Sequence, residues 1–197
     1  MPRPSPGRSA PVRRPGPAEL AAAEGRTVPD VIGPGLHVLF CGINPGRWSG
    51  AVGHHFAHPG NRFWKALHAS GFTDERLAPE RERELLRSGV GITNLVSRTT
   101  ASAAELGADE LRRGGATLAR KVERWRPAAV GFLGLTAYRA AFGRPKATVG
   151  EQDERIGTAR LWLLANPSGL QGRYGLEDMA AQLRELRQAV AGPDRSN

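Results

Sequence analysis

The stretch that decides the fold reads Val38-Leu39-Phe40-Cys41-Gly42-Ile43-Asn44-Pro45-Gly46. Four consecutive apolar residues, ended by a glycine, predict a short buried strand, and the Asn-Pro-Gly sequence that follows predicts a tight turn. In open α/β sheets, ligands bind in the loops at the carboxyl ends of the strands. Asn44 is therefore the first candidate for a functional residue.

Strand and helix patterns alternate along the rest of the chain. Apolar runs predict strands at 36–42, 90–96, 128–134 and 160–165. Apolar residues at helical spacing predict helices at 61–70, 79–87, 102–125, 135–142 and 176–190. The polar connection 143–159 has room for an edge hairpin. This alternation predicts a mostly parallel sheet covered on both faces, which is a three-layer α/β/α sandwich.

The chain is strongly basic, with a formal net charge of +9 and a pI near 11.0. Only Lys65, Lys121 and Lys146 among its 28 basic residues are lysines, so the excess is almost wholly arginine, which pairs with phosphates and guanine edges. The charge indicates either attraction to a polyanion or a general compositional bias. The alternating charges of 79–87 predict a solvated helix face.

The single cysteine and the hydropathy pattern limit the class of protein. Cys41 lies inside an apolar run, so the chain cannot build a disulfide framework or a cysteine-bound metal site by itself. No run of about 18 apolar residues is present, and the N-terminus lacks the apolar segment of a secretory signal. We therefore expect a soluble protein of a reducing cytoplasm.

The N-terminal composition predicts how the chain divides. Residues 1–17 hold six prolines and four arginines without an acidic residue, which is typical of disorder, and an Ala-rich patch within 18–27 is compatible with a short helix. We expect a disordered basic N-terminal arm at 1–27, one folded domain at 28–192 and a frayed tail at 193–197. The arm either adds non-specific DNA contact or is an ordinary disordered terminus.

A glycine- and histidine-rich loop is predicted at 47–60, and a structureless loop of this length is usually functional. Its Phe56 either caps the core or forms a stacking platform for a planar ligand. No nearby carboxylate or cysteine completes a ligand set with His54, His55 and His58, so we expect exposed loop histidines and no metal.

A second Asn-Pro turn, Asn166-Pro167-Ser168-Gly169-Leu170, follows the last predicted strand. In a parallel sheet Asn44 and Asn166 would meet at one rim, and the alternative is two separate local turns. Asn94, near the end of the strand at 90–96, either faces the same site or satisfies the backbone of the turn that follows.

Three motifs carry a family resemblance: Gly42-Ile43-Asn44-Pro45-Gly46, Phe56-Ala57-His58-Pro59-Gly60-Asn61-Arg62-Phe63-Trp64 and Asn166-Pro167-Ser168-Gly169-Leu170. In this order they resemble the mismatch-specific uracil/thymine-DNA glycosylase branch of the uracil-DNA glycosylase superfamily, over about residues 36–190. The resemblance implies base excision repair by hydrolysis of the N-glycosidic bond of flipped uracil, thymine or modified cytosine opposite guanine in double-stranded DNA.

The resemblance also implies roles for five pocket residues. Asn44 orients the water that attacks the sugar, and Phe56 stacks on the flipped base. The backbone around Ile43 and Ser49 helps to hold the base edge. Asn166 stands where other members of the superfamily carry a histidine that donates to the departing base.

The last motif is expected to contact the duplex. Leu170 would insert as a wedge into the gap left by the flipped base, while Gly169 and Gln171 contact the widowed guanine. Ser168 and Arg173 would contact phosphates. The implied partner is double-stranded DNA with G:U or G:T mispairs, bound by a monomer without a cofactor in the cytoplasm, and at the nucleoid if the protein is bacterial.

The residue type at position 44 predicts a slow enzyme. A neutral amide can position water but cannot act as the general base that a carboxylate would provide, so the rate must depend on positioning and on the opening of mispairs. Five positions depart from the family pattern near the pocket, namely Arg47, Trp48, His54, His55 and Asn94, and Gln171-Gly172 alters the last loop. These departures leave the choice among uracil, thymine and modified cytosine open.

Two other classes of protein remain as alternatives. A catalytically silent DNA-binding protein on the same scaffold would keep the charge and the wedge but release no base. A nucleotide-binding oxidoreductase would explain a glycine-rich loop after the first strand. The chain, however, has no Gly-x-Gly-x-x-Gly sequence there, and Pro45 would interrupt a helix N-terminus poised for phosphate.

Overall fold

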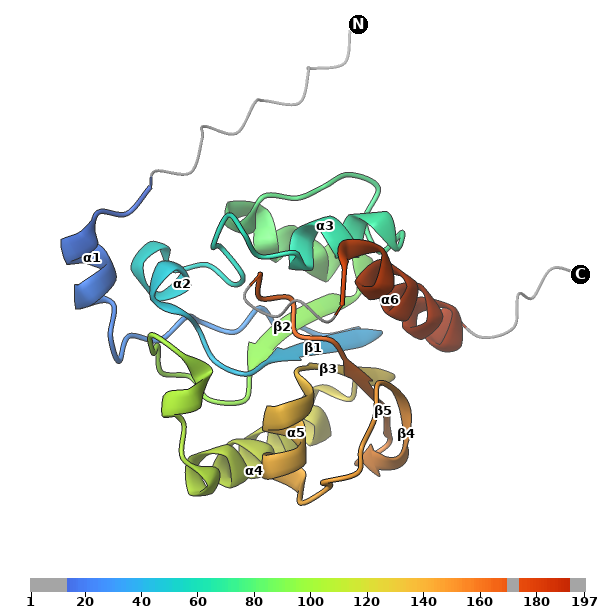
Figure 1. Cartoon of the computed structure of the whole chain (residues 1–197). Helices are drawn as coiled ribbons and strands as arrows, with labels where there is room; N and C mark the ends of the chain where they lie inside the picture. Colours follow the sequence, from blue (N-terminus) through green and yellow to red (C-terminus); the bar gives the residue numbers. More distant parts are fainter. Residues whose placement is uncertain (1–13, 170–173, 192–197) are drawn as a thin grey trace, which may run out of the picture.

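The structure, a computed structural model, describes residues 14–169 and 174–191. Five strands form one sheet in the order β2-β1-β3-β5-β4, and helices cover both of its faces (Figure 1). The predicted three-layer α/β/α sandwich is therefore confirmed. No helix in these two described ranges is long and apolar enough to cross a membrane.

Four of the five strands are parallel. Strand β1 (Val38–Gly42) lies between β2 (Val90–Asn94) and β3 (Ala129–Leu133), and β5 (Ala159–Leu164) continues the parallel part beside β3. Every residue of β1, β2 and β3 is buried, as expected for parallel strands covered by helices. Strand β4 (Gly150–Ile156) pairs antiparallel with β5 at the edge and forms the hairpin for which 143–159 has room.

Two helical layers enclose the sheet (Figure 1). One face carries α3 (Phe63–Ala69), the 3₁₀ helix η1 (Pro79–Ser88) and α6 (Leu176–Ala191). The opposite face carries α4 (Ala108–Trp125) and α5 (Leu135–Phe142). Except at the start of α4, these helices agree closely with the predicted segments, because each buries an apolar stripe on the sheet.

Side chains of β1 alternate between the two layers. Phe40 packs edge-on against Phe63 of α3, with ring centroids 5.5 Å apart. Leu39 and Cys41 belong to the apolar cluster on the side of α4. Burial raises the pKa of the Cys41 thiol, so this thiol stays protonated in the folded protein.

The N-terminal boundary of the folded domain differs from the prediction. Helix α1 (Pro17–Ala22) lies inside the predicted arm at 1–27, and the Glu19 carboxylate accepts a hydrogen bond from the Gly16 N–H at 2.8 Å. Ala23 is fully buried, and Thr27 forms an antiparallel bridge with Arg98. The described residues 14–27 therefore belong to the folded domain, because contacts with segments distant in sequence order them.

Two predicted segments are interrupted. The loop at 47–60 begins with a short helix, α2 (Arg47–Val52), which ends at Gly53 in the left-handed conformation with φ of +77°. The Ser102–Glu105 capping box begins only the short 3₁₀ helix η2 (Ala103–Glu105), and α4 begins separately after Gly107. The break occurs at Leu106, whose extended backbone lets its side chain be buried.

Two adjacent glycines of α4 provide a test of this packing. A Cβ atom on Gly114 would lie 2.5 Å from the carbonyl oxygen of Leu95, whereas a Cβ on Gly115 would meet its nearest atom at 3.5 Å. We expect Gly114→Ala to destabilise the protein by about 1–3 kcal/mol through overpacking. Gly115→Ala should stabilise it by up to about 1 kcal/mol through helix propensity. Urea unfolding midpoints of the two variants check this, and equal midpoints would contradict the close approach of α4 to Leu95.

Candidate active site

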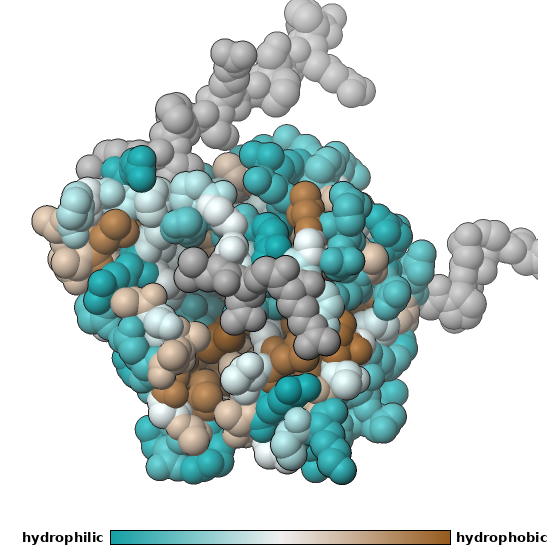
Figure 2. All heavy atoms as spheres, viewed as in Figure 1, coloured by the Kyte–Doolittle hydropathy of each residue, from teal (hydrophilic) through white to brown (hydrophobic). Residues whose placement is uncertain are grey.

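The candidate site lies where the parallel strands end. Gly42, Asn94 and Leu133 end β1, β2 and β3, and Asn166 follows β5 by two residues. The carboxyl ends of parallel strands share one edge of the sheet. Figure 2 has the same view as Figure 1. It shows hydrophobic side chains exposed near the middle of the molecule, with hydrophilic residues around them. The predicted site residues within the described ranges gather at this edge.

The side-chain amide of Asn44 is held in one orientation. Its Nδ2 donates to Thr100 Oγ1 at 2.7 Å, to the Arg98 carbonyl at 3.1 Å and to the Pro45 carbonyl at 3.2 Å. The Thr100 hydroxyl donates its own proton to the Ser102 carbonyl at 2.9 Å, so it acts as an acceptor toward Asn44. Among the described residues, no hydrogen bond engages Asn44 Oδ1. Asn44 therefore presents an acceptor at the end of β1.

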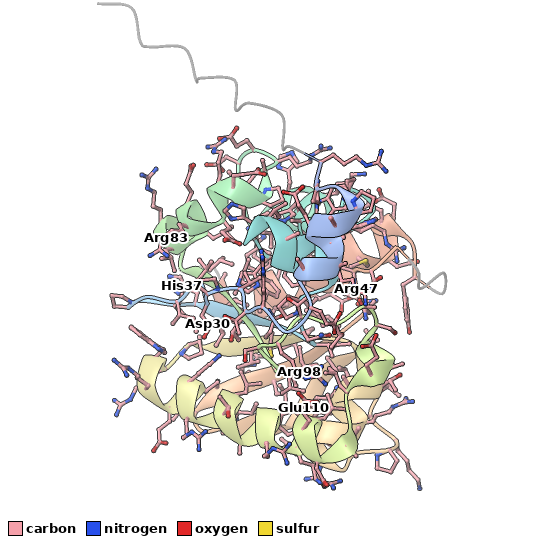
Figure 3. All side chains as sticks on the ribbon, turned by 90° about the vertical axis from the view of Figure 1, so that its left-hand side faces the viewer. Asp30, His37, Arg47, Arg83, Arg98 and Glu110 are labelled. Atoms are coloured by element: carbon pink, nitrogen blue, oxygen red, sulfur yellow. The ribbon has the colours of Figure 1, made fainter. Side chains whose placement is uncertain are left out.

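The segment that holds Asn44 is itself anchored from distant parts of the chain. The Thr100 N–H donates to the Pro45 carbonyl at 3.2 Å, and the Thr99 N–H donates to the Arg26 carbonyl at 2.8 Å. The Arg98 guanidinium pairs with Glu110 at the start of α4, at 2.6 Å, and Figure 3 shows the two side by side. No local sequence signal indicates this support, because Arg98, Thr100 and Glu110 lie more than fifty residues from Asn44.

Phe56 occupies a strained position beside Gly42. Its φ is +53°, in the left-handed region that non-glycine residues rarely adopt. Its ring stacks on Phe63 at 4.2 Å between centroids, and a Cβ on Gly42 would lie 3.2 Å from the ring edge. Ser49 Oγ accepts the N–H of Ala57 at 3.2 Å. The Ser49 side chain therefore supports the Phe56 loop.

His54 and His55 are not the exposed loop histidines that the sequence predicts. His55 is only 2% exposed, and its backbone N–H donates to Glu82 Oε2 at 2.8 Å. His54 Nδ1 lies 3.0 Å from Glu82 Oε1. The prediction that 79–87 presents a purely solvated charged face is also wrong, because Glu82 is 6% exposed. A buried carboxylate requires such partners, and His58 alone of the three histidines is exposed.

The Asn94 side chain faces the site, as one of the two alternatives for this residue predicts, and not the backbone of the turn that follows β2. It is 8% exposed, and its Nδ2 lies 3.3 Å from His55 Nδ1. Its Oδ1 lies 2.5 Å from the point that a Cβ on Gly42 would occupy. Asn94 Oδ1 and the Phe56 ring therefore meet over Gly42, and only a glycine there leaves room for both.

Asn44 and Asn166 lie on the same rim, as one of the two interpretations of the Asn-Pro turns predicts. Strand β3 lies between β1 and β5, so two strand spacings, roughly 10 Å, separate their ends. Gly134 follows β3 and lies between Ile43 and Asn166. A Cβ atom on Gly134 would lie 2.9 Å from Ile43 Cδ1 and 3.8 Å from Asn166 Nδ2, so the glycine leaves space between these two side chains. Asn166 Oδ1 accepts the Ser168 N–H at 2.9 Å, which leaves Nδ2 as a donor.

Arg62 connects the last motif to the rest of the site, and sequence reasoning assigned it no role. Its N–H donates to the Pro167 carbonyl at 3.0 Å, and its guanidinium donates to the carbonyls of Ser168 and Tyr174. Gly169 lies close to the Gly60 carbonyl, which a Cβ would approach to 2.8 Å. The predicted contacts of Leu170, Gln171 and Arg173 lie outside the described residues.

Two of the positions that depart from the family pattern contact residues outside the three motifs or at their border. Arg47 pairs with Glu24, at 3.0 Å. The Trp48 ring lies edge-on to His58, with centroids 5.3 Å apart. Trp48 also lines a cavity of about 560 Å³, together with Phe56, Trp64, Lys65 and other residues. Phe56 belongs to this lining, so the cavity adjoins the strand-end site, although Ile43, Asn44 and Asn166 are not among its lining residues.

The fold has a similar solved structure. The solution NMR structure of a protein from Methanosarcina acetivorans, proposed to be a uracil DNA glycosylase, matches with a TM-score of 0.56 and 19% sequence identity. The match covers 83% of this chain and 99% of the other. At this identity the similarity shows a common fold.

The sequence itself shows the family. The pattern of the uracil DNA glycosylase superfamily matches residues 29–190, which include all the described strands and the site at their carboxyl ends. The chain therefore belongs to the uracil DNA glycosylase superfamily.

Proposed function

We propose that this protein is a monofunctional, mismatch-specific DNA glycosylase that removes uracil opposite guanine from double-stranded DNA in base excision repair. Thymine and modified cytosine opposite guanine are further candidate substrates. The observation that carries the proposal is the Asn44 amide, whose Nδ2 is held by Thr100 and two carbonyls while its Oδ1 remains an acceptor. Membership in the superfamily supports glycosylase activity on DNA.

The proposed reaction uses Asn44 to place water. Asn44 Oδ1 accepts a hydrogen bond from the water, which then attacks the anomeric carbon C1′ of the flipped nucleotide. The bond from C1′ to the base nitrogen breaks, its electron pair leaves with the base, and the base takes up the proton that the water loses. Because an amide cannot accept that proton, positioning and leaving-group stabilisation must supply the rate. We therefore expect a slow enzyme.

Four groups around Asn44 are suited to hold the base. Phe56 offers an aromatic surface for stacking, and the Ile43 carbonyl is already engaged by the Val96 N–H, so contact with Ile43 would use its N–H or side chain. Asn94 Oδ1 can accept from a base N–H. Asn166 Nδ2 can donate to a base carbonyl, which would stabilise the negative charge of the departing base.

Recognition of the mispair is proposed to reside in the last motif. Leu170 would insert into the stack, Gly169 and Gln171 would contact the widowed guanine, and Ser168 and Arg173 would contact phosphates. Arg62 donates to Ser168 within this motif and to Tyr174 beyond it, and would keep the motif in register with the base pocket. Mispairs cost less to open than paired bases, which favours G:U over A:U. Such a protein would act as a monomer on DNA in the cytoplasm.

Base release from labelled duplexes tests the proposal. We expect single-turnover release of uracil from G:U well above release from A:U, with G:T and single-stranded uracil as further substrates. Asn44→Ala should lower release by about 10²-fold or more, because water loses its positioning group. Salt-sensitive DNA binding without release from any duplex would instead favour a catalytically silent DNA-binding protein.

Two neighbouring threonines allow a matched test of the Asn44 anchor. Thr100 Oγ1 accepts from Asn44, whereas Thr99 Oγ1 is buried and has no hydrogen-bond partner among the residues that the structure describes. We expect Thr100→Val to lower single-turnover release by roughly tenfold, the effect of one lost hydrogen bond. Thr99→Val should leave the rate unchanged and the stability equal or higher. Equal rates for the two variants would mean that Thr100 does not position Asn44.

A pair of phenylalanines tests the stacking platform. Phe56 and Phe72 are both half-buried and pack on the same apolar cluster, but only Phe56 borders Gly42. Base–aromatic stacking is worth about 1–3 kcal/mol per base, so Phe56→Leu should weaken binding of a G:U duplex by about 5- to 150-fold. Phe72→Leu should leave the dissociation constant unchanged. A similar loss in both variants would assign Phe56 to the core alone.

A further inference from the structure

The proposed reaction does not use the cavity of about 560 Å³ that adjoins the strand-end site. We call it the Trp48 cavity, after one of its lining residues. The rest of the lining comes from Arg14 before α1, the loop between α2 and α3, α3 itself and residues 76–79, which lead into η1 (Figure 1). Small-molecule sites usually have volumes of roughly 300–1,000 Å³. The Trp48 cavity is therefore large enough to hold one nucleotide.

Two indole rings form part of the cavity wall. Trp64 is only 6% exposed, and its Nε1–H donates to the His55 carbonyl at 3.2 Å, which fixes the ring. The Arg14 guanidinium carbon lies 6.0 Å from the centroid of the Trp48 ring. Bases of single strands stack on aromatic rings and on guanidinium planes. The cavity therefore offers surfaces on which a base can stack.

The indole of Trp48 also supplies a hydrogen-bond donor. Its Nε1 is buried and makes no hydrogen bond among the residues that the structure describes. An unsatisfied buried donor costs about 1–3 kcal/mol, and an indole N–H can only donate. A base bound in the cavity would bring carbonyl oxygens and ring nitrogens, which are the acceptors that such a donor requires.

The charge of the lining is entirely positive. Three cationic side chains, Arg14, Lys65 and Arg76, line the cavity, and no carboxylate of the described residues does. None of the three takes part in an ion pair within 14–169 and 174–191. Glu75, which precedes Arg76 in the sequence, pairs instead with Arg81 at 2.7 Å. Cations without a local counterion attract phosphate, so the cavity can hold both the base and the phosphate of one nucleotide.

The position of the cavity identifies this nucleotide. Phe56 belongs to the cavity lining, and it is also proposed to stack on the flipped target base at the strand ends. A nucleotide in the cavity would therefore be the neighbour of the target on the same strand. Stacking surfaces combined with basic groups are typical of proteins that bind single-stranded DNA.

We propose that the Trp48 cavity binds the nucleotide next to the target when the DNA is single-stranded, which makes uracil in single strands a second substrate class. A single strand has no widowed guanine for the last motif to contact, so another contact must hold the strand. In a duplex the neighbouring base stays paired and stacked, and its extrusion would cost a few kcal/mol. This inference rests on the proposed function, because it assumes that Phe56 stacks on the target base.

Removal of the neighbouring base tests the proposal on the wild-type protein. The probes are single strands with one 2′-fluorinated deoxyuridine, which resists cleavage because fluorine disfavours the oxocarbenium-like state. A stable abasic residue replaces the nucleotide on its 5′ side, on its 3′ side or, as a control, several positions away. Stacking of one base is worth about 1–3 kcal/mol, so one of the two adjacent replacements should weaken binding by about 5- to 150-fold relative to the distant one. Equal dissociation constants for all three strands would overturn the proposal.

Two tryptophans provide matched variants. Trp48 and Trp125 are both half-buried with a guanidinium near the ring, but Trp125 ends α4 on the opposite face of the sheet. Trp48→Leu should raise the ratio of the single-strand to the G:U duplex dissociation constant by about 5- to 150-fold. It should also remove the effect of the adjacent abasic residue, whereas Trp48→Phe, which keeps a ring, should retain that effect.

Trp125→Leu should leave the ratio of the two dissociation constants unchanged. An unchanged ratio in a folded Trp48→Leu variant, or equal changes in Trp48→Leu and Trp125→Leu, would overturn the proposal.

Salt dependence tests the phosphate contact. On single strands each neutralised phosphate contributes roughly 0.7 to the slope of the logarithm of the dissociation constant against the logarithm of the salt concentration. Lys65→Ala and Arg76→Ala should each lower this slope by about 0.7. Lys146→Ala, which changes an exposed lysine after α5, should not change it. Unchanged slopes in both Lys65→Ala and Arg76→Ala would overturn the proposal.

Uracil release from an unmodified G:U duplex tests the proposed function separately. Absent release together with single-strand binding that depends on Trp48 would reject catalysis only. Release from G:U together with single-strand binding that does not depend on Trp48 would reject the role of the cavity only.

Discussion

The close approach of three segments over Gly42 is the constraint on which the site depends. Asn94 Oδ1 and the Phe56 ring both occupy the space that a side chain at this position would fill, at 2.5 Å and 3.2 Å from the point of its Cβ. Phe56 reaches this place through a left-handed backbone conformation that costs free energy. The cost is offset by its stack on Phe63 and by the Ser49 hydroxyl that accepts from Ala57. A glycine at the end of a central strand thus lets a loop and a neighbouring strand share one surface.

Support for the site comes from outside the motifs that identify it. The segment 25–27 bonds to Thr99, and the following residue, Thr100, holds the Asn44 amide. Glu82 holds the backbone of His55, and Arg62 donates to Ser168 in the last motif and to Tyr174 beyond it. Buried polar groups of this kind are satisfied by partners far away in the sequence. The result is a set of amides with defined donor and acceptor directions, which is what positioning chemistry requires.

Part of the arginine content has a structural use. Several guanidinium groups of the described residues pair with carboxylates on the surface: Arg47, Arg81, Arg98, Arg144 and Arg160. Exposed pairs of this kind contribute little stability each. The chain has 28 basic and 19 acidic residues, so a formal net charge of +9 remains even if every acidic residue is paired. Some arginines therefore serve the fold, while the surplus charge favours a polyanion.

The sequence by itself determined the sandwich, the strand ends and the rim shared by Asn44 and Asn166, because short apolar runs and Asn-Pro turns are local signals. It misplaced the arm boundary, missed α2, and expected His54, His55 and the 79–87 segment at the surface. Only the tertiary structure decided that Glu82 is buried against the two histidines, that Thr100 orients Asn44 and that His55 contacts Asn94. These are contacts between groups many residues apart, and residue patterns along the chain carry no information about which distant donor meets which acceptor.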